Sequence, residues 1–147
     1  VQARAEGTSG VNAMAKGQMR EWMLGDVVPE MLAKAREDGD LGGVMSAANV
    51  MQTFGEREKA RRLYNEVIAG FTESLGASHT DTLNAKMGLA ILFVAGGNPE
   101  QAKRVLSTGP GARQAFTELI QSYTLQLGDD HEVVVDARHA CALAFTD

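Results

Sequence analysis

The chain has 147 residues, of which 44% are hydrophobic and 22% are charged, and this composition is typical of one folded domain rather than of a disordered segment. Its formal net charge of -5 disfavours a nucleic-acid partner, because such partners are bound by a basic surface that releases counterions. The single cysteine, Cys141, excludes an intramolecular disulfide and a cysteine-based zinc cage, and the apolar runs are too short to span a bilayer.

The first forty residues differ in composition from the rest of the chain. Residues 1–10 are small and polar, which predicts a flexible segment. Residues 11–40 are predicted to form helices that cap the fold, with Asp26 capping a short helix that ends near Gly39. Methionine and tryptophan recur in this segment at helical spacing, which favours either adaptable core filling or a soft binding surface. On the second interpretation, the candidate partner-binding residues here are Met19, Trp22 and Met23.

From residue 41 onward the chain repeats itself. A shift of 52 residues superimposes 64–93 on 116–145 with nine of thirty positions identical. The identical pairs are Glu66/Glu118, Ile68/Ile120, Thr72/Thr124, Leu75/Leu127, Gly76/Gly128, His79/His131, Ala85/Ala137, Ala90/Ala142 and Phe93/Phe145. A shift of 42 residues aligns the earlier part of the chain, and the difference of ten falls at 107–114, where Gly109-Pro110-Gly111 predicts an inserted loop.

Each period of 42 residues predicts a pair of helices. The first helices are expected at 41–54, 81–95 and 132–145, and the second helices at 56–75 and at 99–107, the latter resuming at 113–127 after the loop. The predicted N-terminal caps are Thr80 or Asp81, Asn98 and Asp130. Small residues recur at matched positions and predict close helix packing: Ala48, Ala90 and Ala142 in the first helices, and Ala60 and Ala102 in the second.

One stretch of the repeat is similar to a known family. The segment that runs Leu75-Gly76-Ala77-Ser78-His79-Thr80-Asp81-Thr82-Leu83, with Met87-Gly88-Leu89-Ala90 after it, resembles the kinesin-light-chain type of tetratricopeptide repeat. That pattern reads Leu-Gly-x-x-His-Pro-Asp-Thr-Leu and then Asn-Leu-Ala, so the chain departs from it at Thr80 and at Gly88, where the family often has a peptide-contacting Asn. The resemblance covers residues 40–147 and is best over 54–102.

The resemblance implies an all-α fold, a short right-handed solenoid of helix hairpins whose first helices line a concave protein-binding groove. The repeats would be 41–80, 81–131 with the inserted loop 107–114, and a partial copy at 132–147. Polar residues of the first helices are then the candidates for contact with a partner in the groove. These candidates are Asn84, Lys86, Asp136 and Arg138.

Residues that resemble catalytic or metal-binding groups have a simpler structural interpretation. His79 and His131 occupy equivalent positions just before a helix, which favours turn residues that bond to the backbone over metal ligands. His139 has no suitably spaced partner, and Cys141 aligns with the apolar Leu89, which favours a buried and unreactive thiol. The sequence therefore predicts no catalytic, cofactor or metal site, and an enzyme is the least favoured class of function.

The favoured function is a non-enzymatic scaffold for protein–protein interaction, bound to other protein subunits in a larger assembly. One specific form of this hypothesis is an accessory subunit of an algal photosystem or light-harvesting complex, imported into the chloroplast after removal of a targeting segment, since the chain begins at Val1. We expect no nucleic-acid partner and no direct insertion into a membrane, although the assembly itself can be attached to one. The alternative is a free adaptor that binds a short peptide in its groove.

Overall fold

The computed structural model describes residues 17–107, 109 and 111–145, and over these residues the chain is all-α, with helices joined by short turns. No strand is present among these residues. The helices are α2 (Val28–Asp38), α3 (Leu41–Thr53), α4 (Arg57–Leu75), α5 (Thr80–Ala95), α6 (Pro99–Leu106), α7 (Ala112–Leu127) and α8 (Glu132–Phe145), and the π-helix η1 (Met23–Val27) precedes α2. The predictions for residues 1–16 lie outside the described residues.

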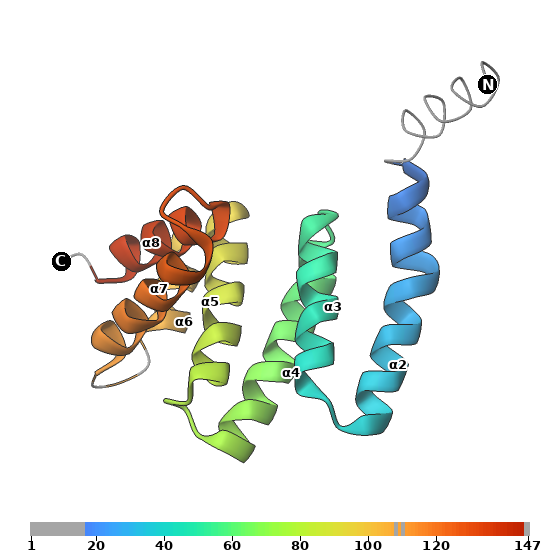
Figure 1. Cartoon of the computed structure of the whole chain (residues 1–147), viewed down its shortest axis with the longest axis horizontal. Helices are drawn as coiled ribbons and strands as arrows, with labels where there is room; N and C mark the ends of the chain where they lie inside the picture. Colours follow the sequence, from blue (N-terminus) through green and yellow to red (C-terminus); the bar gives the residue numbers. More distant parts are fainter. Residues whose placement is uncertain (1–16, 108, 110, 146–147) are drawn as a thin grey trace.

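Successive helices stand side by side and run in opposite directions from α2 to α5 (Figure 1). Each of these helices packs on the next one in the chain, and α8 packs on both α6 and α7. The helices expected to come first in each pair, α3, α5 and α8, also contact one another in that order. α2 lies at one end of this row, and α7 and α8 lie at the other end (Figure 1).

The predicted helices from residue 41 onward are confirmed to within a few residues. The break in the second helix of the later pair is also present, since α6 ends at Leu106 and α7 begins at Ala112. Gly111 precedes α7 with φ 82°, in the left-handed region that glycine adopts without strain. Helix boundaries were predictable here because glycine and proline act locally, through the backbone conformations that they allow or forbid.

The predicted caps are confirmed in one position and wrong in others. Asp26 lies inside a continuous helical segment, 17–38, because the chain passes from helix through the π-helical turn η1 into α2 without interruption. We call this segment the N-terminal helix. His79, rather than Thr80 or Asp81, is the N-cap of α5. Asn98 occupies the N-cap position of α6 as predicted, but its side chain makes no capping bond. Asp130 lies in the turn before α8, where His131 makes the equivalent bond to the backbone.

Two hydrophobic clusters form the core. One joins α2, α3, α4 and part of α5, and the other joins the rest of α5 to α6, α7 and α8. Phe93 of α5 and Val105 of α6 pack against both clusters, so the two are continuous. Ala48, Ala60, Ala90 and Ala102 are fully buried, which confirms the close packing predicted for them. Ala142 is exposed, so the prediction of close helix packing at this position is wrong. The reason is that α6 packs over Ala90 of α5, whereas no described helix packs over Ala142 of α8.

Candidate protein-binding groove

A groove of about 780 Å³ runs across α3, α5 and α8. We call it the concave groove. Its polar lining comes mainly from amides and hydroxyls, and Met45, Met87 and Ile91 supply apolar area between them. The polar and charged lining residues are Asn49, Gln52, Thr53, Arg57, Tyr64, Asn84, Tyr123, Glu132 and Asp136.

Two tyrosine hydroxyls hold the amides of the concave groove in place. Tyr64 reaches from α4 and donates its hydroxyl proton to Asn49 Oδ1 or to Gln52 Oε1, the latter at 2.9 Å. Tyr123 reaches from α7 and donates to Asn84 Oδ1. Because the amide oxygen of Asn49 and of Asn84 receives a hydroxyl proton, the amide N–H₂ of each is left to donate to a ligand.

Tyr64 is buried, with 1% of its surface exposed, and Tyr123 is partly buried. Burial raises the pKa of Tyr64 well above its ordinary value, and the nearby Tyr123 raises it further. Burial also raises the pKa of Tyr123 to about 12. The hydroxyls therefore stay protonated at neutral pH and act as donors to the asparagines.

Gly88 has no side chain and leaves room for the ring of Tyr64 beneath the groove. A Cβ atom at Gly88 would lie 2.6 Å from Cε1 and 2.9 Å from Cζ of Tyr64, closer than carbon atoms approach one another. The tyrosine ring therefore occupies the space that a side chain on α5 would take. Gly88 thus leaves room for the ring, and the amides that line the groove come from other positions.

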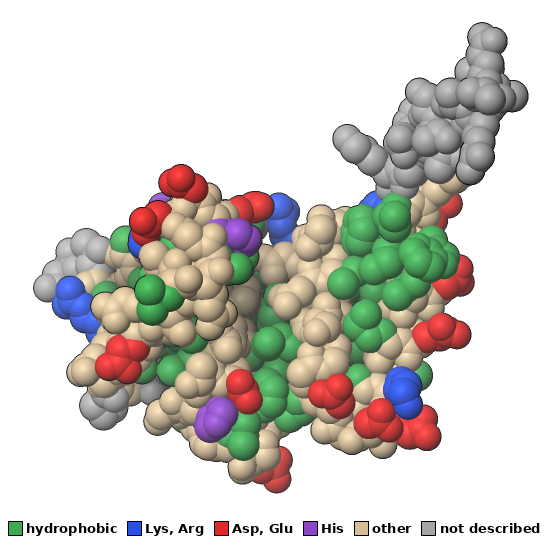
Figure 2. Space-filling view, viewed as in Figure 1, with side chains coloured by type: hydrophobic (Ala, Val, Ile, Leu, Met, Phe, Trp, Pro, Cys, Tyr) green, Lys and Arg blue, Asp and Glu red, His purple; other side chains and the backbone are tan. Residues whose placement is uncertain are grey.

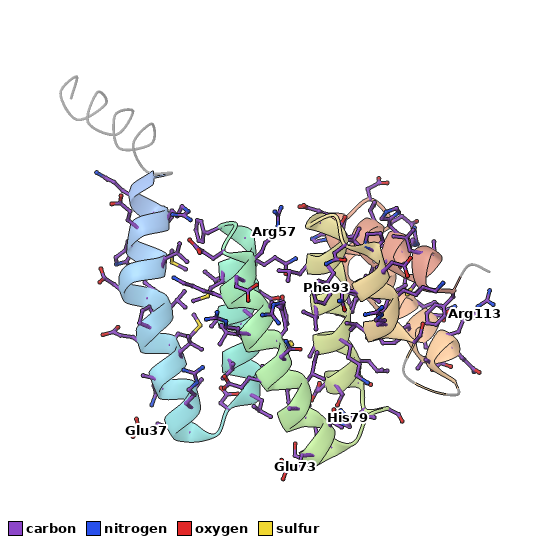
Figure 3. The ribbon with its side chains drawn as sticks, turned by 180° about the vertical axis from the view of Figure 1, so that it is seen from behind. Glu37, Arg57, Glu73, His79, Phe93 and Arg113 are labelled. Atoms are coloured by element: carbon purple, nitrogen blue, oxygen red, sulfur yellow. The ribbon has the colours of Figure 1, made fainter. Side chains whose placement is uncertain are left out.

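The acidic and basic residues of the concave groove come from different helices. Glu132 and Asp136 come from α8, and neither makes an ion pair with another described residue. Arg57 lies on α4 and projects away from the body of the molecule (Figure 3). A bound segment would therefore meet two carboxylates beside α8 and a guanidinium beside α4.

Only two of the four predicted groove residues line the concave groove, namely Asn84 and Asp136. Lys86 is buried, with 7% of its surface exposed, and burial lowers its pKa. Arg138 lines a second groove, between α7 and α8, where it donates to Asp129 Oδ1 at 2.9 Å. The expectation that all four face one groove is wrong, because residues two apart on a helix point about 200° apart around its axis.

The three candidates in the N-terminal helix lie away from the concave groove. Met19 and Trp22 are exposed, at 47% and 53% of their surface, whereas Met23 is partly buried. Hydrophobic side chains gather over the upper part of this helix (Figure 2). These residues therefore belong to a second surface at the end of the molecule.

The two repeated histidines are turn residues, as predicted. Nδ1 of His79 accepts the backbone N–H of Asp81, and Nδ1 of His131 accepts that of Val133, each at 3.1 Å. Cys141 is half-buried, and burial raises its pKa to about 11, so the thiol stays protonated and weakly nucleophilic at neutral pH. Among the described residues, no group of three or more His, Cys, Asp or Glu side chains is arranged to hold a metal ion.

Comparisons with known proteins returned no match: no family model fits the chain, and no curated protein and no solved structure is significantly similar to it. Within the described residues, no helix is both long and apolar enough to cross a membrane.

Sequence reasoning missed Asn49, Gln52 and the two tyrosines as lining residues. Asn49 and Gln52 are three residues apart on a predicted helix, so helical spacing places them on one face. The tyrosines gave no such signal, because each belongs to a second helix and only its hydroxyl reaches the groove.

Proposed function

We propose that this chain is a non-enzymatic protein-interaction module, a short solenoid of tetratricopeptide type that binds a segment of another protein in its concave groove. The repeat in the sequence and the contacts among α3, α5 and α8 support the stacked arrangement. The observation that carries the proposal is the row of amides from α3 and α5, which accept hydrogen bonds from two tyrosine hydroxyls.

Amide side chains suit the backbone of an extended polypeptide. A peptide group offers one N–H donor and one C=O acceptor, and an asparagine whose oxygen is already satisfied offers N–H₂ to such a carbonyl. Asn49 and Asn84 lie on neighbouring helices and can therefore contact successive parts of one segment. Because the tyrosines fix these amides beforehand, little side-chain entropy is lost on binding.

The charges predict the chemistry of the segment. A basic side chain fits beside Glu132 and Asp136, and an acidic one fits beside Arg57. The ligand is thus expected to be an extended segment that carries opposite charges at its two ends, with small or apolar residues over Met87 and Ile91 between them.

Two forms of this function have separate support. A polar, charged groove suits an exchangeable peptide and favours the free adaptor. Exposed apolar side chains outside the groove, of which Leu125 is 88% exposed and Trp22 53%, favour a subunit that is held in an assembly. The two forms are compatible, because the surfaces are different.

The test is selection of random dodecapeptides on the whole chain, followed by affinity measurement on variants. Asn84→Ala and Asp136→Asn should each weaken the selected peptides by about tenfold or more, as loss of a central contact does. Gln126→Ala is the matched control, because it removes an exposed amide from α7 outside the groove and should change nothing. The Asp136 side chain makes no hydrogen bond or ion pair with a described residue, so its substitution is expected to leave the fold intact. If both groove variants bind the peptides as the control does, the proposal fails.

A further inference from the structure

A second groove, of about 720 Å³, opens between α7 and α8 at the end of the row of helices. We call it the end groove. Ile120, Leu125, Cys141 and Phe145 give it an apolar lining, and Arg113 and Arg138 supply its positive charge. Arg113 projects from the end of the molecule (Figure 3) and forms no ion pair with a described residue.

The chain contains a filled copy of this groove. The shift of 52 residues maps α7 and α8 onto α4 and α5, and Ile120, Thr124 and Phe145 have identical counterparts in Ile68, Thr72 and Phe93. In the earlier copy α6 packs on the α5 side of the corresponding surface. Val105 of α6 packs against both core clusters, and Ala102 and Leu106 pack in one cluster with Ala90. The end groove therefore has the shape and lining of a surface that accepts an amphipathic helix.

The opposite end of the chain presents a helix of the required type. The N-terminal helix precedes α3 and packs on it, just as α4 precedes α5 and packs on it. It therefore has the position that the second helix of a pair has relative to the first helix of the next pair. A second helix is also what would follow α8 in the stack. Met19 and Trp22, three residues apart on one face of this helix, are both exposed.

Direction and charge agree with this pairing. α6 follows α5 in the chain and begins near the C-terminal end of α5. A helix that packs on α8 in the same orientation would therefore begin near the C-terminal end of α8, beside Phe145. Its first turns would bring Met19 and Trp22 to the apolar lining. Asp26, one turn after Trp22 on the same face, would then lie toward Arg138, whose guanidinium also pairs with Asp129.

We propose that the end groove binds the N-terminal helix of a second copy of this chain, so that copies continue the stack head to tail. This inference rests on the stacked arrangement of hairpins proposed above. The contact joins two different surfaces, so each copy keeps one open end and association continues beyond a dimer unless the ends close into a ring.

The test begins with sedimentation velocity of the whole chain over a range of concentrations. We expect species larger than a monomer whose share increases with concentration and decreases with added salt, because Asp26 and Arg138 attract each other across the contact. Trp22→Glu on one surface and Leu125→Glu on the other should each raise the dissociation constant about tenfold or more. Both side chains are exposed, so neither substitution disturbs the core, and Trp22→Ala and Leu125→Ala are milder replacements if either charged variant fails to fold. Leu75→Glu is the control, since it places the same charge on an exposed leucine of α4.

Mixing the two variants decides between head-to-tail docking and other modes of association. Trp22→Glu retains an intact end groove, and Leu125→Glu retains an intact N-terminal helix. Each variant alone should be monomeric, and the mixture should form a one-to-one dimer that grows no further. A symmetric contact between two N-terminal helices predicts instead that Leu125→Glu self-associates as the unmodified chain does.

The proposal is overturned by a monomer at all concentrations, by that symmetric behaviour, or by a mixture in which no dimer forms. Asn84→Ala distinguishes this inference from the proposed peptide binding, because it should abolish peptide capture and leave sedimentation unchanged. A chain that binds peptides and stays monomeric refutes the head-to-tail contact alone.

Discussion

Replacing Gly88 by alanine tests whether the tyrosine ring beneath the concave groove controls the packing of α5. In the middle of a helix, alanine is favoured over glycine by about 0.8–1 kcal/mol. At this position the added Cβ would lie 2.6 Å from Tyr64 Cε1, and Tyr64 is only 1% exposed, so the ring has no open space to enter. Overpacking of this kind costs about 1–3 kcal/mol. Displacing the hydroxyl from Asn49 and Gln52 costs roughly 1 kcal/mol more.

The net expectation is that Gly88→Ala lowers the free energy of unfolding by about 1–3 kcal/mol, since the steric and hydrogen-bond costs exceed the gain in helix propensity. Urea unfolding followed by circular dichroism measures this change. Gly25→Ala is the matched control, because a Cβ there meets nothing within 4 Å. It should leave stability unchanged or raise it by up to about 1 kcal/mol.

A double-mutant cycle identifies the cause. In a Tyr64→Leu background the ring edge is gone, so Gly88→Ala should lose most of its cost, and the coupling energy should be about 1 kcal/mol or more. The reasoning is refuted if Gly88→Ala stabilises the chain as Gly25→Ala does, or if its cost is the same with and without the tyrosine ring.

Three further predictions concern side chains near the groove and the turns. Because burial raises the pKa of both tyrosines above the ordinary 10.0, in Tyr123 to about 12, their contribution to stability is constant below pH 10 and decreases as pH rises beyond it. The chain has only these 2 tyrosines, so phenolate absorbance should appear together with alkaline unfolding rather than near pH 10 in the folded protein. Tyr123→Phe should lower the free energy of unfolding by about 1 kcal/mol in urea melts and also weaken peptide binding, because Asn84 loses the hydroxyl that orients it; unchanged stability would show that this bond is not formed in solution. His79→Ala should cost about 0.5–2 kcal/mol, since the N-cap acceptor for Asp81 is lost, and His79→Asp should restore most of it in the same melts; equal stability of the two variants would exclude a capping role.

The sequence by itself determined the helices from residue 41 onward and the break between α6 and α7. These features depend on local causes, namely apolar spacing, glycine and proline, and the 52-residue repeat then marked His79 and His131 as equivalent turn residues. Asp26 was misassigned as a cap because an acidic residue before a proline is an equally good local signal whether or not the helix already runs through it.

Only the tertiary structure decided which side chains share a surface. Helix geometry alone directs Asn84 and Lys86 to different sides of α5, but the rotation of α5 against its neighbours decides which of them lines the concave groove and which is buried. Tyr64 and Tyr123 reach the groove from α4 and α7. Their hydroxyls bond to Asn49 and Asn84, which lie 15 and 39 positions away in the sequence, so local periodicity could not predict these bonds. Ala90 and Ala142 are identical residues at matched positions, and their burial differs because burial depends on the neighbouring helix rather than on the residue itself.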